Sequence, residues 1–420
     1  MASTTPVGSS RIPASVHLTN FIIPARHPRV SFDFEKAHIA AIVPTYKPKA
    51  LTVRLVQDLL RSSERMHVYV VDDCTPREEG SKVIFKRIQT MSKRVTLLHT
   101  PNNKLKAGAL NYALAHIRES VENSPDVILT LDDDVVIAEN TVKNLVTELM
   151  ETSELGAACS QCRVLNKNKN FLTRLQGLEY LGFNAIRMAD EGFFRGPLVM
   201  HGMLTAFRAE ALYGAKGFEE GHLIEDYEVT TRLKGGGWSV KLALNAPAWT
   251  NVPETFSSLW RQRTRWLYGG IVVVAQTKHP LAVVQDLIGH GAFFATIFAI
   301  DLLIIVKGEG YFSPFIAQWI ITLSLLQFFM WYVFQLWLMR LYEERDRYDW
   351  ALRLSILPEF IYSNLLTVVQ IGAYFFLFFN TLTRTVKETS NRTLQGAVAF
   401  VTRVFRACGY TEHWGTRTSI

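Results

Sequence analysis

Four short clusters of charged and aromatic residues stand in order along the chain, and their side chains could act together on a phosphorylated substrate. The clusters are Asp72-Asp73, Asp132-Asp133-Asp134, Glu225-Asp226 and Gln262-Arg263-Thr264-Arg265-Trp266. Asp132 and Asp134 are one residue apart, so in an extended segment they point the same way and could share a hard divalent cation with a diphosphate. Since a D-x-D sequence is common by chance, its weight depends on the elements around it.

Those elements begin at residue 37, where apolar runs start to alternate with amphipathic stretches. This alternation is typical of parallel strands joined by crossover helices and predicts an α/β fold with a doubly wound sheet. Pro44 is expected to end the first strand. The predicted strands are 37–43, 68–71, 95–98 and 127–131, and the predicted helices are 51–61, 82–91 and 107–118.

In such a sheet, ligands bind beyond the carboxyl ends of the strands, and Thr45, Asp72-Asp73 and 132–134 all fall there. One strand that ends in a carboxylate could simply lead into a solvated turn, but here two strands do so. Lys106 opens a predicted helix, where its ammonium and the free helix amides could both meet phosphate, although a single lysine is more often solvated. The sequence therefore predicts one crevice that holds a metal ion and a nucleotide.

Several of these motifs, taken together, resemble the family 2 glycosyltransferases. The spacing is similar to that of the processive membrane synthases of cellulose, chitin, hyaluronan and poly-N-acetylglucosamine, and the segment 253–270 is especially similar to the bacterial poly-N-acetylglucosamine synthases. The resemblance is close over residues 38–275. The residues that carry it are Ile42-Val43-Pro44-Thr45-Tyr46, Val70-Val71-Asp72-Asp73, Lys106-Ala107-Gly108-Ala109-Leu110-Asn111, Asp132-x-Asp134, Glu225-Asp226 and Gln262-x-x-Arg265-Trp266.

The resemblance implies a GT-A-like catalytic domain and a UDP-sugar donor. Thr45, Tyr46 and Asp73 would line the uridine pocket. Asp132 would lie beside the nucleotide, and Lys106 would approach the diphosphate.

The resemblance also implies a divalent cofactor, Mg²⁺ or Mn²⁺, held by Asp134 together with Asp132. Two departures from the family pattern affect this assignment. The family often has Asp-Gly-Ser where this chain has Asp73-Cys74-Thr75, and the middle residue of the D-x-D motif is acidic here. Asp72 and Asp133 could therefore share roles assigned to their neighbours.

Asp226 is the candidate catalytic base. Sugar transfer from a nucleotide diphosphate needs a leaving group whose charge is neutralised by a metal and basic side chains, and a base that takes the proton of the acceptor hydroxyl. A single displacement inverts the anomeric centre, so an α-linked donor gives a β-linked product, as the resemblance also implies. Without the other motifs, Glu225-Asp226 would indicate only an acidic helix start, which the helix dipole favours.

Gln262, Arg265 and Trp266 lie at i, i+3 and i+4, so on a helix they project from one face. With Glu225, this face could form a clamp on the acceptor and the diphosphate. Trp266 would offer an aromatic surface to the acceptor sugar, while Arg265 or Arg263 would meet the diphosphate. The alternative is a basic juxtamembrane helix with an interfacial tryptophan, and both descriptions can hold together.

Composition limits the classes of function. The 420 residues carry a formal charge of +7, which suits nucleic acid, an anionic membrane or a phosphorylated ligand. Because the basic residues are dispersed or juxtamembrane, nucleic-acid binding is disfavoured. Of the four cysteines, Cys159-x-x-Cys162 forms a lone pair without a second pair beside it, so a reduced, cytosol-facing chain is expected.

Three apolar segments follow the motifs, at 292–306, 315–339 and 356–379. The second and third exceed the ~20 residues that cross a bilayer, and three spans are predicted. Asp301, in the first segment, could line a path for the sugar or pair helices. With the catalytic domain in the cytosol, three spans would place a basic tail on the far side, against the positive-inside tendency. One segment could therefore be re-entrant, or the tail could be an exception.

The predicted organisation is a flexible tail at 1–35 without a cleavable signal, a catalytic domain at 36–252, interfacial helices at 253–286, a transmembrane region at 287–382 and a C-terminal tail at 383–420. The predicted function is a multi-pass, membrane-bound, inverting and processive β-glycosyltransferase. It would extend a polysaccharide from a UDP-sugar, with UDP-N-acetylglucosamine preferred by similarity, and could also export the product. Two alternatives remain open: a non-processive family 2 transferase with a lipid acceptor, and a catalytically idle membrane scaffold or export subunit.

Overall fold

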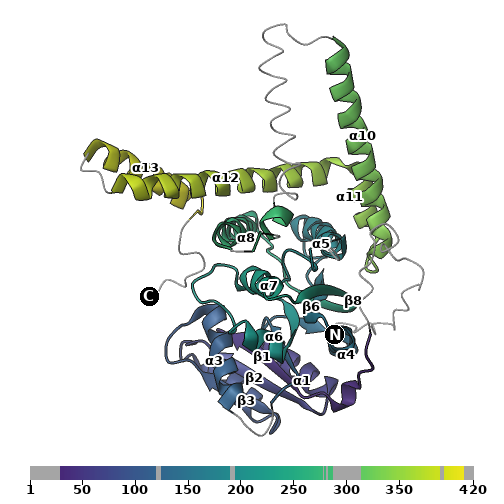
Figure 1. The fold of residues 1–420 in the computed structure, drawn as a ribbon, viewed down its shortest axis with the longest axis vertical. Coiled ribbons are helices and arrows are strands. Elements are labelled where there is room, and N and C mark those ends of the chain that lie inside the picture. The colour runs from purple at the N-terminus through teal and green to yellow at the C-terminus, as the bar shows by residue number, and fades with distance from the viewer. Residues whose placement is uncertain are drawn as a thin grey trace.

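An α/β domain lies beneath a group of long helices in the computed structural model of this protein (Figure 1). The structure describes residues 29–119, 124–189, 194–277, 279–280, 282–286, 314–387 and 392–410. The predicted segment at 292–306, with Asp301, lies outside these residues.

The described strands form one eight-stranded sheet in the order β3-β2-β1-β4-β7-β6-β8-β5. They are β1 (Ile39–Thr45), β2 (Met66–Asp72), β3 (Val95–His99), β4 (Val127–Leu131), β5 (Val136–Ile137), β6 (Leu155–Val164), β7 (Leu204–Arg208) and β8 (Ser239–Thr250). The first four are parallel, which confirms the predicted half of the sheet. The second half is mixed, because β7 runs antiparallel to both β4 and β6.

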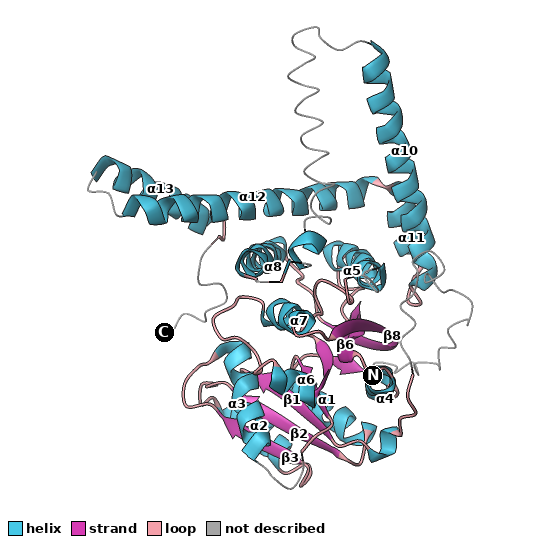
Figure 2. Cartoon of the chain, in the orientation of Figure 1, coloured by secondary structure: helices cyan, strands magenta, loops and turns pink. Residues whose placement is uncertain are grey.

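Helices cover both faces of this sheet (Figure 2). They are α1 (Ala50–Ser62), α2 (Glu79–Gln89), α3 (Leu105–Glu119), α4 (Thr141–Glu151), α5 (Phe171–Ala189), α6 (Ala209–Gly214) and α7 (Glu225–Gly235), while α8 (Phe256–Gln276) packs against α7 and is paired with α5. Alternate side chains of β1 enter two cores: Ala41 and Val43 pack in the core that includes α1 and α4, while Ala40 and Ile42 pack in the core with α3 and α7.

Pro44 lies inside β1 instead of ending it. The described pairing of β1 with β4 stops at Ile42, whereas the pairing with β2 continues through Pro44 to Thr45. At Pro44 the strand therefore has a ladder on one side only, a position that tolerates a residue without an N–H. The extension carries Thr45 to the edge where the candidate site begins.

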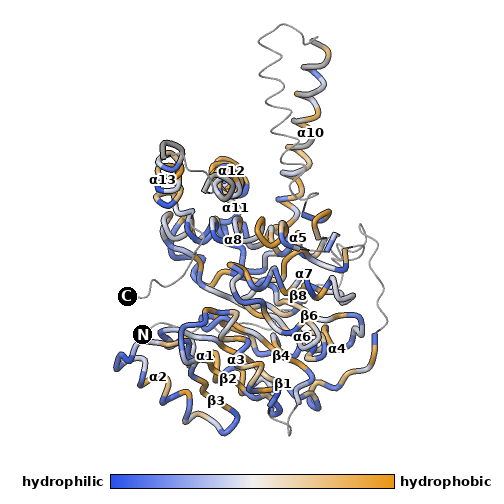
Figure 3. The backbone as a smooth tube through the Cα atoms, turned by 60° about the vertical axis from the view of Figure 1, so that its left-hand side comes forward, coloured by the Kyte–Doolittle hydropathy of each residue, from blue (hydrophilic) through white to orange (hydrophobic). Residues whose placement is uncertain are grey.

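The C-terminal part consists of α10 (Pro314–Leu338), α11 (Arg347–Ser355), α12 (Leu357–Lys387) and α13 (Arg392–Ala407). By length and composition, Ile321–Leu341 and Leu357–Thr383 could each cross a membrane. These helices match the second and third predicted segments. In Figure 3, where the tube is coloured by hydropathy, α10 remains upright while α12 appears foreshortened, so the two helices run crosswise.

The start of α11 is fastened to the catalytic domain by ion pairs of Asp346 and Asp349. Lys167 Nζ lies 2.8 Å from Asp349 Oδ2, and Asp349 is fully buried. Arg174 bonds both Asp346, at 2.6 Å, and Asp349, at 2.9 Å. Because a buried charge is stable only when paired, these contacts fix the helices on the domain.

Candidate active site

The carboxyl ends of β1, β2 and β4 meet at one edge of the sheet and bring the predicted nucleotide residues together. The Thr45 hydroxyl donates to the Asp133 carboxylate, and the Asp73 amide donates to the Thr45 carbonyl at 3.0 Å. Thr45 therefore joins the two acidic segments that the sequence placed in one crevice.

Asp72 and Asp73 have different partners. Asp72 accepts hydrogen bonds from His99 Nδ1 and from the Thr75 amide, both at 2.9 Å, which holds the turn after β2. Asp73 accepts from the Thr100 hydroxyl at 3.0 Å and from the Lys104 amide at 2.7 Å. Asp72 therefore does not duplicate the contacts of Asp73.

The turn after β2 also explains a departure from the family pattern. Cys74 has a φ of 58°, in the left-handed region that favours glycine, and glycine is the residue that the family often has there. Beside this turn, Tyr46 is half-buried, and the Lys47 ammonium lies 5.9 Å from the centre of its ring.

Lys106, at the start of α3, connects the two halves of the site. Its ammonium lies 2.6 Å from Asp132 Oδ1 and 2.9 Å from Glu225 Oε1, and it donates to the Gly202 carbonyl at 2.9 Å. Burial alone would lower the pKa of Lys106, but the nearby carboxylates of Asp132, Glu225 and Asp226 raise it. Lys106 is therefore a permanent cation between β4 and α7.

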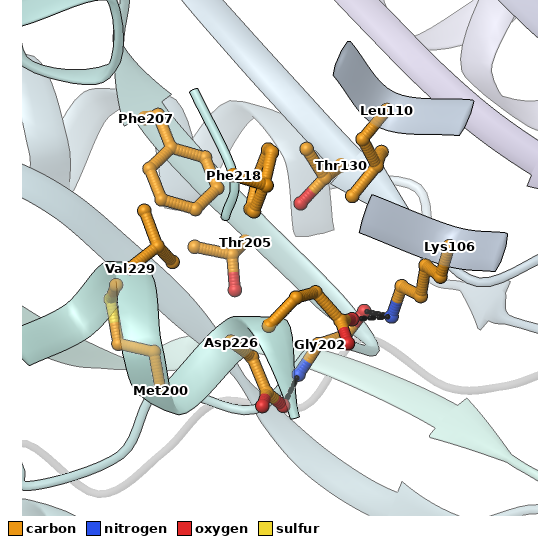
Figure 4. A pocket seen from close by; sticks show the side chains of 11 residues that line it. Lys106, Leu110, Thr130, Met200, Gly202, Thr205, Phe207, Phe218, Asp226 and Val229 are labelled. Carbon is orange, nitrogen blue, oxygen red and sulfur yellow. Dashed lines mark hydrogen bonds and ion pairs between the residues drawn. The ribbon is translucent and has the colours of Figure 1, made fainter. Parts of the chain in front are cut away.

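Asp226 lies in the first turn of α7, opposite Lys106 across Gly202 (Figure 4). One of its oxygens accepts from the Gly202 amide at 2.7 Å, and the other accepts from the Tyr227 amide at 2.8 Å. Burial and the charge of Glu225 raise the pKa of Asp226 to about 6, against the opposing effect of Lys106. A carboxylate of this basicity can accept a proton from a hydroxyl as its oxygen forms a new bond.

Glu225 is buried too, which would raise its pKa, but Lys106 and Arg265 lower it instead. The pKa values of the two adjacent carboxylates thus shift in opposite directions: Glu225 stays ionised, while Asp226 becomes the more basic group. Such separation is typical of sites in which one acid supplies charge and the other moves a proton.

Gly202 is a site residue that the sequence did not single out within its loop. A Cβ added here would lie 2.6 Å from Lys106 Nζ, 3.2 Å from Asp226 Oδ2 and 3.3 Å from Glu225 Oε1. Only glycine lets the three charged groups approach this closely. Its place between His201 and Met203 carried no signal of that contact.

Asp134 is the residue predicted to hold a metal. Thr250 Oγ1 donates to its two oxygens at 3.2 and 3.3 Å. Burial, together with the charges of Asp132 and Asp133, raises the pKa of Asp134 to about 6. The described residues contain no cluster of three or more metal-ligating side chains. The donors therefore suit a hard cation that takes its other ligands from phosphate and water, as Mg²⁺ commonly does.

The clamp residues on α8 divide into two groups. Arg265 donates to the Leu223 carbonyl at 3.4 Å, just before α7, and Trp266 packs beside Ile224 and Tyr227. These two residues thus adjoin the first turn of α7, which carries the candidate base.

Arg263 has a different environment, because its guanidinium makes a forked pair with Glu179 of α5 at 3.0 and 2.6 Å. It also donates to Gln262 at 2.5 Å and lies 4.2 Å from the Trp266 ring centre. Arg263 is only 3% exposed, and burial, which would lower its pKa, is outweighed by Glu179. Of the two arginines considered for the diphosphate, the structure brings Arg265 to α7 and pairs Arg263 with α5.

Comparison with protein families agrees with this geometry. The sequence model described as glycosyl transferase family group 2 matches residues 127–380, more than half of the chain, and that of glycosyl transferase family 2 matches residues 40–213. The chain belongs to glycosyl transferase family group 2.

Curated relatives of this glycosyltransferase are distant. A probable glycosyltransferase, YdaM, of Bacillus subtilis is 27% identical over 244 residues, which are 57% of each chain. The poly-beta-1,6-N-acetyl-D-glucosamine synthase of Staphylococcus epidermidis is 26% identical over 204 residues, 49% of this chain and 48% of the relative. The chain thus spans about half the length of these relatives.

Among solved structures, the mannosyltransferase PcManGT of Pyrobaculum calidifontis, in complex with GDP-Man and Mn²⁺, has a TM-score of 0.50 and 20% identity. The match covers 73% of this glycosyltransferase and 86% of the other chain. It shows the shared GT-A-like fold, which confirms the predicted fold class.

Three further residues of the glycosyltransferase are buried beside the crevice. His201 Nε2 donates to the Ser160 carbonyl at 2.5 Å, and burial lowers the pKa of His201 to about 3, so the ring is neutral. Cys159 and Cys162 are buried free thiols; burial raises the pKa of both, that of Cys159 to about 12. Thiols of this kind do not act as nucleophiles at neutral pH.

Proposed function

We propose that this glycosyltransferase is a membrane-bound, inverting and processive enzyme that extends a β-linked polysaccharide from a UDP-sugar, with UDP-N-acetylglucosamine as donor. The observation that carries the proposal is the arrangement around Lys106. This cation touches Asp132 at the nucleotide end and Glu225 beside Asp226 at the acceptor end. Lys106 thereby joins the residues proposed to bind the donor to those proposed to bind the acceptor.

The donor side follows from the residues at the strand ends. Thr45, Tyr46 and Asp73 would hold the uridine, and Asp132 with Asp134 would hold Mg²⁺ or Mn²⁺ against the diphosphate. The cation, when bound, would neutralise charge that develops on the departing diphosphate. Support comes from the oxygen donors present and from the Mn²⁺ in the PcManGT complex, a protein of the same fold.

The acceptor side depends on Asp226. Its carboxylate would take the proton of the acceptor hydroxyl as that oxygen bonds to the anomeric carbon, and the bond from this carbon to the diphosphate would break. UDP would leave with the bonding electrons, stabilised by Lys106 and Arg265. One displacement inverts the centre, so an α-linked donor would yield a β-linked product.

The acceptor chain would lie against Trp266, with Gln262 and Arg265 on the same face of α8. Arg263 would support this face through Glu179. The similarity to the poly-beta-1,6-N-acetyl-D-glucosamine synthase of Staphylococcus epidermidis supports poly-N-acetylglucosamine as the class of product. We also propose the division into a catalytic domain at 36–252, a region at 253–286 that bears the clamp, and a membrane region at 287–382. The catalytic domain would face the cytosol, where UDP-sugars are made.

The test is UDP release by the purified, detergent-solubilised full chain, with Mg²⁺ or Mn²⁺, across a panel of UDP-sugars, with products sized on a gel. Asp226→Asn is the active-site variant. Glu228→Gln is the matched control, because Glu228 lies on the same helix and pairs with Arg232 at 2.5 Å. Long polymer from one donor, dependent on metal and lost only in Asp226→Asn, is expected.

Other outcomes contradict parts of the proposal. Turnover that gives only a short or lipid-linked product would overturn processivity and favour a transferase with a lipid acceptor. If no donor is turned over while UDP still binds, the chain is not by itself a synthase, and the scaffold alternative gains support.

A further inference from the structure

Helix α12 has one face fixed to the catalytic domain along most of its length. Near its start, the Tyr362 hydroxyl donates to Glu179 Oε2 at 2.7 Å. Near its end, Asn380 donates to the Tyr268 hydroxyl at 3.3 Å, and the ring of Phe376 lies 5.0 Å from that of Tyr268. The helix therefore lies along α5 and α8, and the domain contacts both ends of it.

The opposite face of α12 is an exposed apolar stripe. Most of its members are separated by three, four or seven residues, so they share one side of the helix, and each is between 52% and 69% exposed. The stripe consists of Leu357, Phe360, Ile361, Val368, Phe375, Phe378 and Leu382. The exposed Asn364 lies between Ile361 and Val368 on this side, but the rest of the face is apolar, and an exposed apolar face of this length favours an apolar surface that covers it.

The chain after α12 turns back toward the domain. The Phe405 ring of α13 lies 5.1 Å from that of Phe376. Beyond α13, the Tyr410 hydroxyl donates to the Val369 carbonyl at 2.8 Å, and Trp260 of α8 donates to the Cys408 carbonyl at 2.7 Å. Cys408 thus lies against α8, which is itself paired with α5 of the catalytic domain through Arg263 and Glu179.

These contacts argue against α12 as a membrane crossing. The middle of a crossing helix lies at the centre of the bilayer. Val369, in the middle of α12, is hydrogen-bonded to Tyr410, which packs in one cluster with Trp260 of α8. If α12 crossed the bilayer, α8 and its exposed Arg261 would therefore lie near that centre. A charged side chain at that depth is strongly disfavoured. Helix α10 has no such difficulty: it projects away from the domain, crosswise to α12, with an exposed apolar surface (Figure 1).

We propose that α12 lies flat in the surface of a lipid bilayer that contains anionic lipids, with its stripe sunk into the boundary between headgroups and acyl chains, while α10 enters the bilayer. Helix α13 continues this surface: Phe400 and Val404 are exposed apolar residues, and Arg403 and Arg406 are exposed cations beside them. Apolar and basic side chains together are what anionic membrane surfaces bind. The inference rests on the membrane location proposed above.

Under this proposal, α12, which contains the segment 356–379 predicted as a span, would lie in the membrane surface instead. The proposal also removes the conflict over the basic tail. If α12 does not cross, the residues that follow it stay on the side of the catalytic domain, as the contacts of Cys408 and Tyr410 require. Their arginines then face the cytosol, as the positive-inside tendency predicts.

The depth of single labels tests the proposal in the full chain, reconstituted into vesicles of phosphatidylcholine and phosphatidylglycerol. The exposed Cys74 and Cys408 are first replaced by serine, and nitroxide labels are placed at Ile361→Cys, Val368→Cys and Leu382→Cys. A flat helix gives one shallow depth at all three positions, within about 10 Å of the headgroups. A crossing helix gives a deep centre at 368 and shallow ends.

Helix α10 supplies the matched control. Labels at Ile321→Cys, Leu325→Cys, Phe329→Cys and Val333→Cys should deepen toward the middle, to about 15 Å. A shallow α10 would overturn the membrane location itself and the proposal with it. Two results with a deep α10 would overturn the lipid contact of α12. Labels on the α12 stripe that are accessible to a water-soluble nickel complex but not enriched in oxygen would indicate solvent, and labels accessible to neither reagent would indicate a protein partner.

Two further readouts bear on sidedness and charge. With Cys74 or Cys408 as the exposed thiol, a membrane-impermeant maleimide should label both from the same side of sealed vesicles, and labelling from opposite sides would overturn the proposal. A label at Val404→Cys should be deeper with phosphatidylglycerol than in phosphatidylcholine alone, because Arg403 and Arg406 attract anionic headgroups. Equal depth in both lipids would overturn the preference for anionic lipid.

Discussion

The crevice at the strand ends and the contacts beneath the long helices differ in how their carboxylates are paired with cations. In the crevice, Asp132 and Glu225 both touch the ammonium of Lys106, and Asp134 feels the repulsion of Asp132 and Asp133. Beneath the helices, Arg263 faces Glu179 and Arg353 faces Glu359, each through short contacts. In the first region several carboxylates share the single cation of Lys106, whereas in the second each of these two acids has an arginine of its own.

The difference separates chemistry from attachment. Crowded carboxylates raise each other's pKa and favour a cation from outside, which is what a metal-dependent transferase needs. Matched pairs gain nothing from a ligand, and they hold α5, α8 and α12 in one arrangement. Mutations should therefore change activity in one region and stability in the other.

The largest expected effect is that of Asp226→Asn. Loss of the base should lower kcat by about 10²–10⁴, the usual contribution of general base catalysis. UDP affinity should stay within about twofold, because the nucleotide residues lie at the strand ends. Rates and isothermal titration with UDP check this. An unchanged kcat would remove Asp226 from the chemistry.

Arg263→Met is expected to act on stability. It leaves Glu179 buried without its guanidinium, which should cost about 3–5 kcal/mol, seen as a lower Tm in detergent. The double variant Arg263→Met with Glu179→Leu should recover most of the loss. If the Tm is instead unchanged and UDP binding weakens, Arg263 belongs to the diphosphate clamp and the comparison between the two regions fails.

Asp134→Asn is expected to raise the Mn²⁺ concentration for half-maximal activity by about one to two orders of magnitude, at least the loss that outer-shell changes produce. Since the change also removes a like charge, Tm should not fall. Asp349→Asn is the control, because Asp349 is paired with Lys167 and Arg174 beneath the long helices. It should lower Tm and leave the Mn²⁺ requirement unchanged. A reversal of these two results would refute the division between a crevice that sets activity and paired charges that set stability.

The smallest expected effect is a shift in pH dependence. Because the pKa of Asp226 is raised to about 6, the carboxylate is lost as pH falls through that value, and kcat/KM at saturating Mn²⁺ should drop there instead of near pH 4. Glu225→Gln removes the neighbouring negative charge, so the acid limb should move to lower pH, by up to about one unit. An unmoved limb would assign the titration to another group.

The sequence predicted β1 to β4 and the helices between them, because period-two and period-3.6 patterns are local properties of a segment. It also placed Thr45, Asp73 and Asp132 at one edge, since parallel strands align their carboxyl ends. It could not show that β7 inserts antiparallel between β4 and β6, because that pairing joins segments about 40 to 80 residues apart.

Residue types and their order by themselves determined the family, the acidic edge of the sheet and the face shared by Gln262, Arg265 and Trp266. Only the tertiary structure separated Arg263 from Arg265, since each is a cation on the same helix and the partner, Glu179, lies 84 residues away. Only the tertiary structure placed Gly202 between Lys106 and Asp226 and turned α12 across α10. Hydropathy measures how apolar a helix is, but its direction is set by the surface against which it packs.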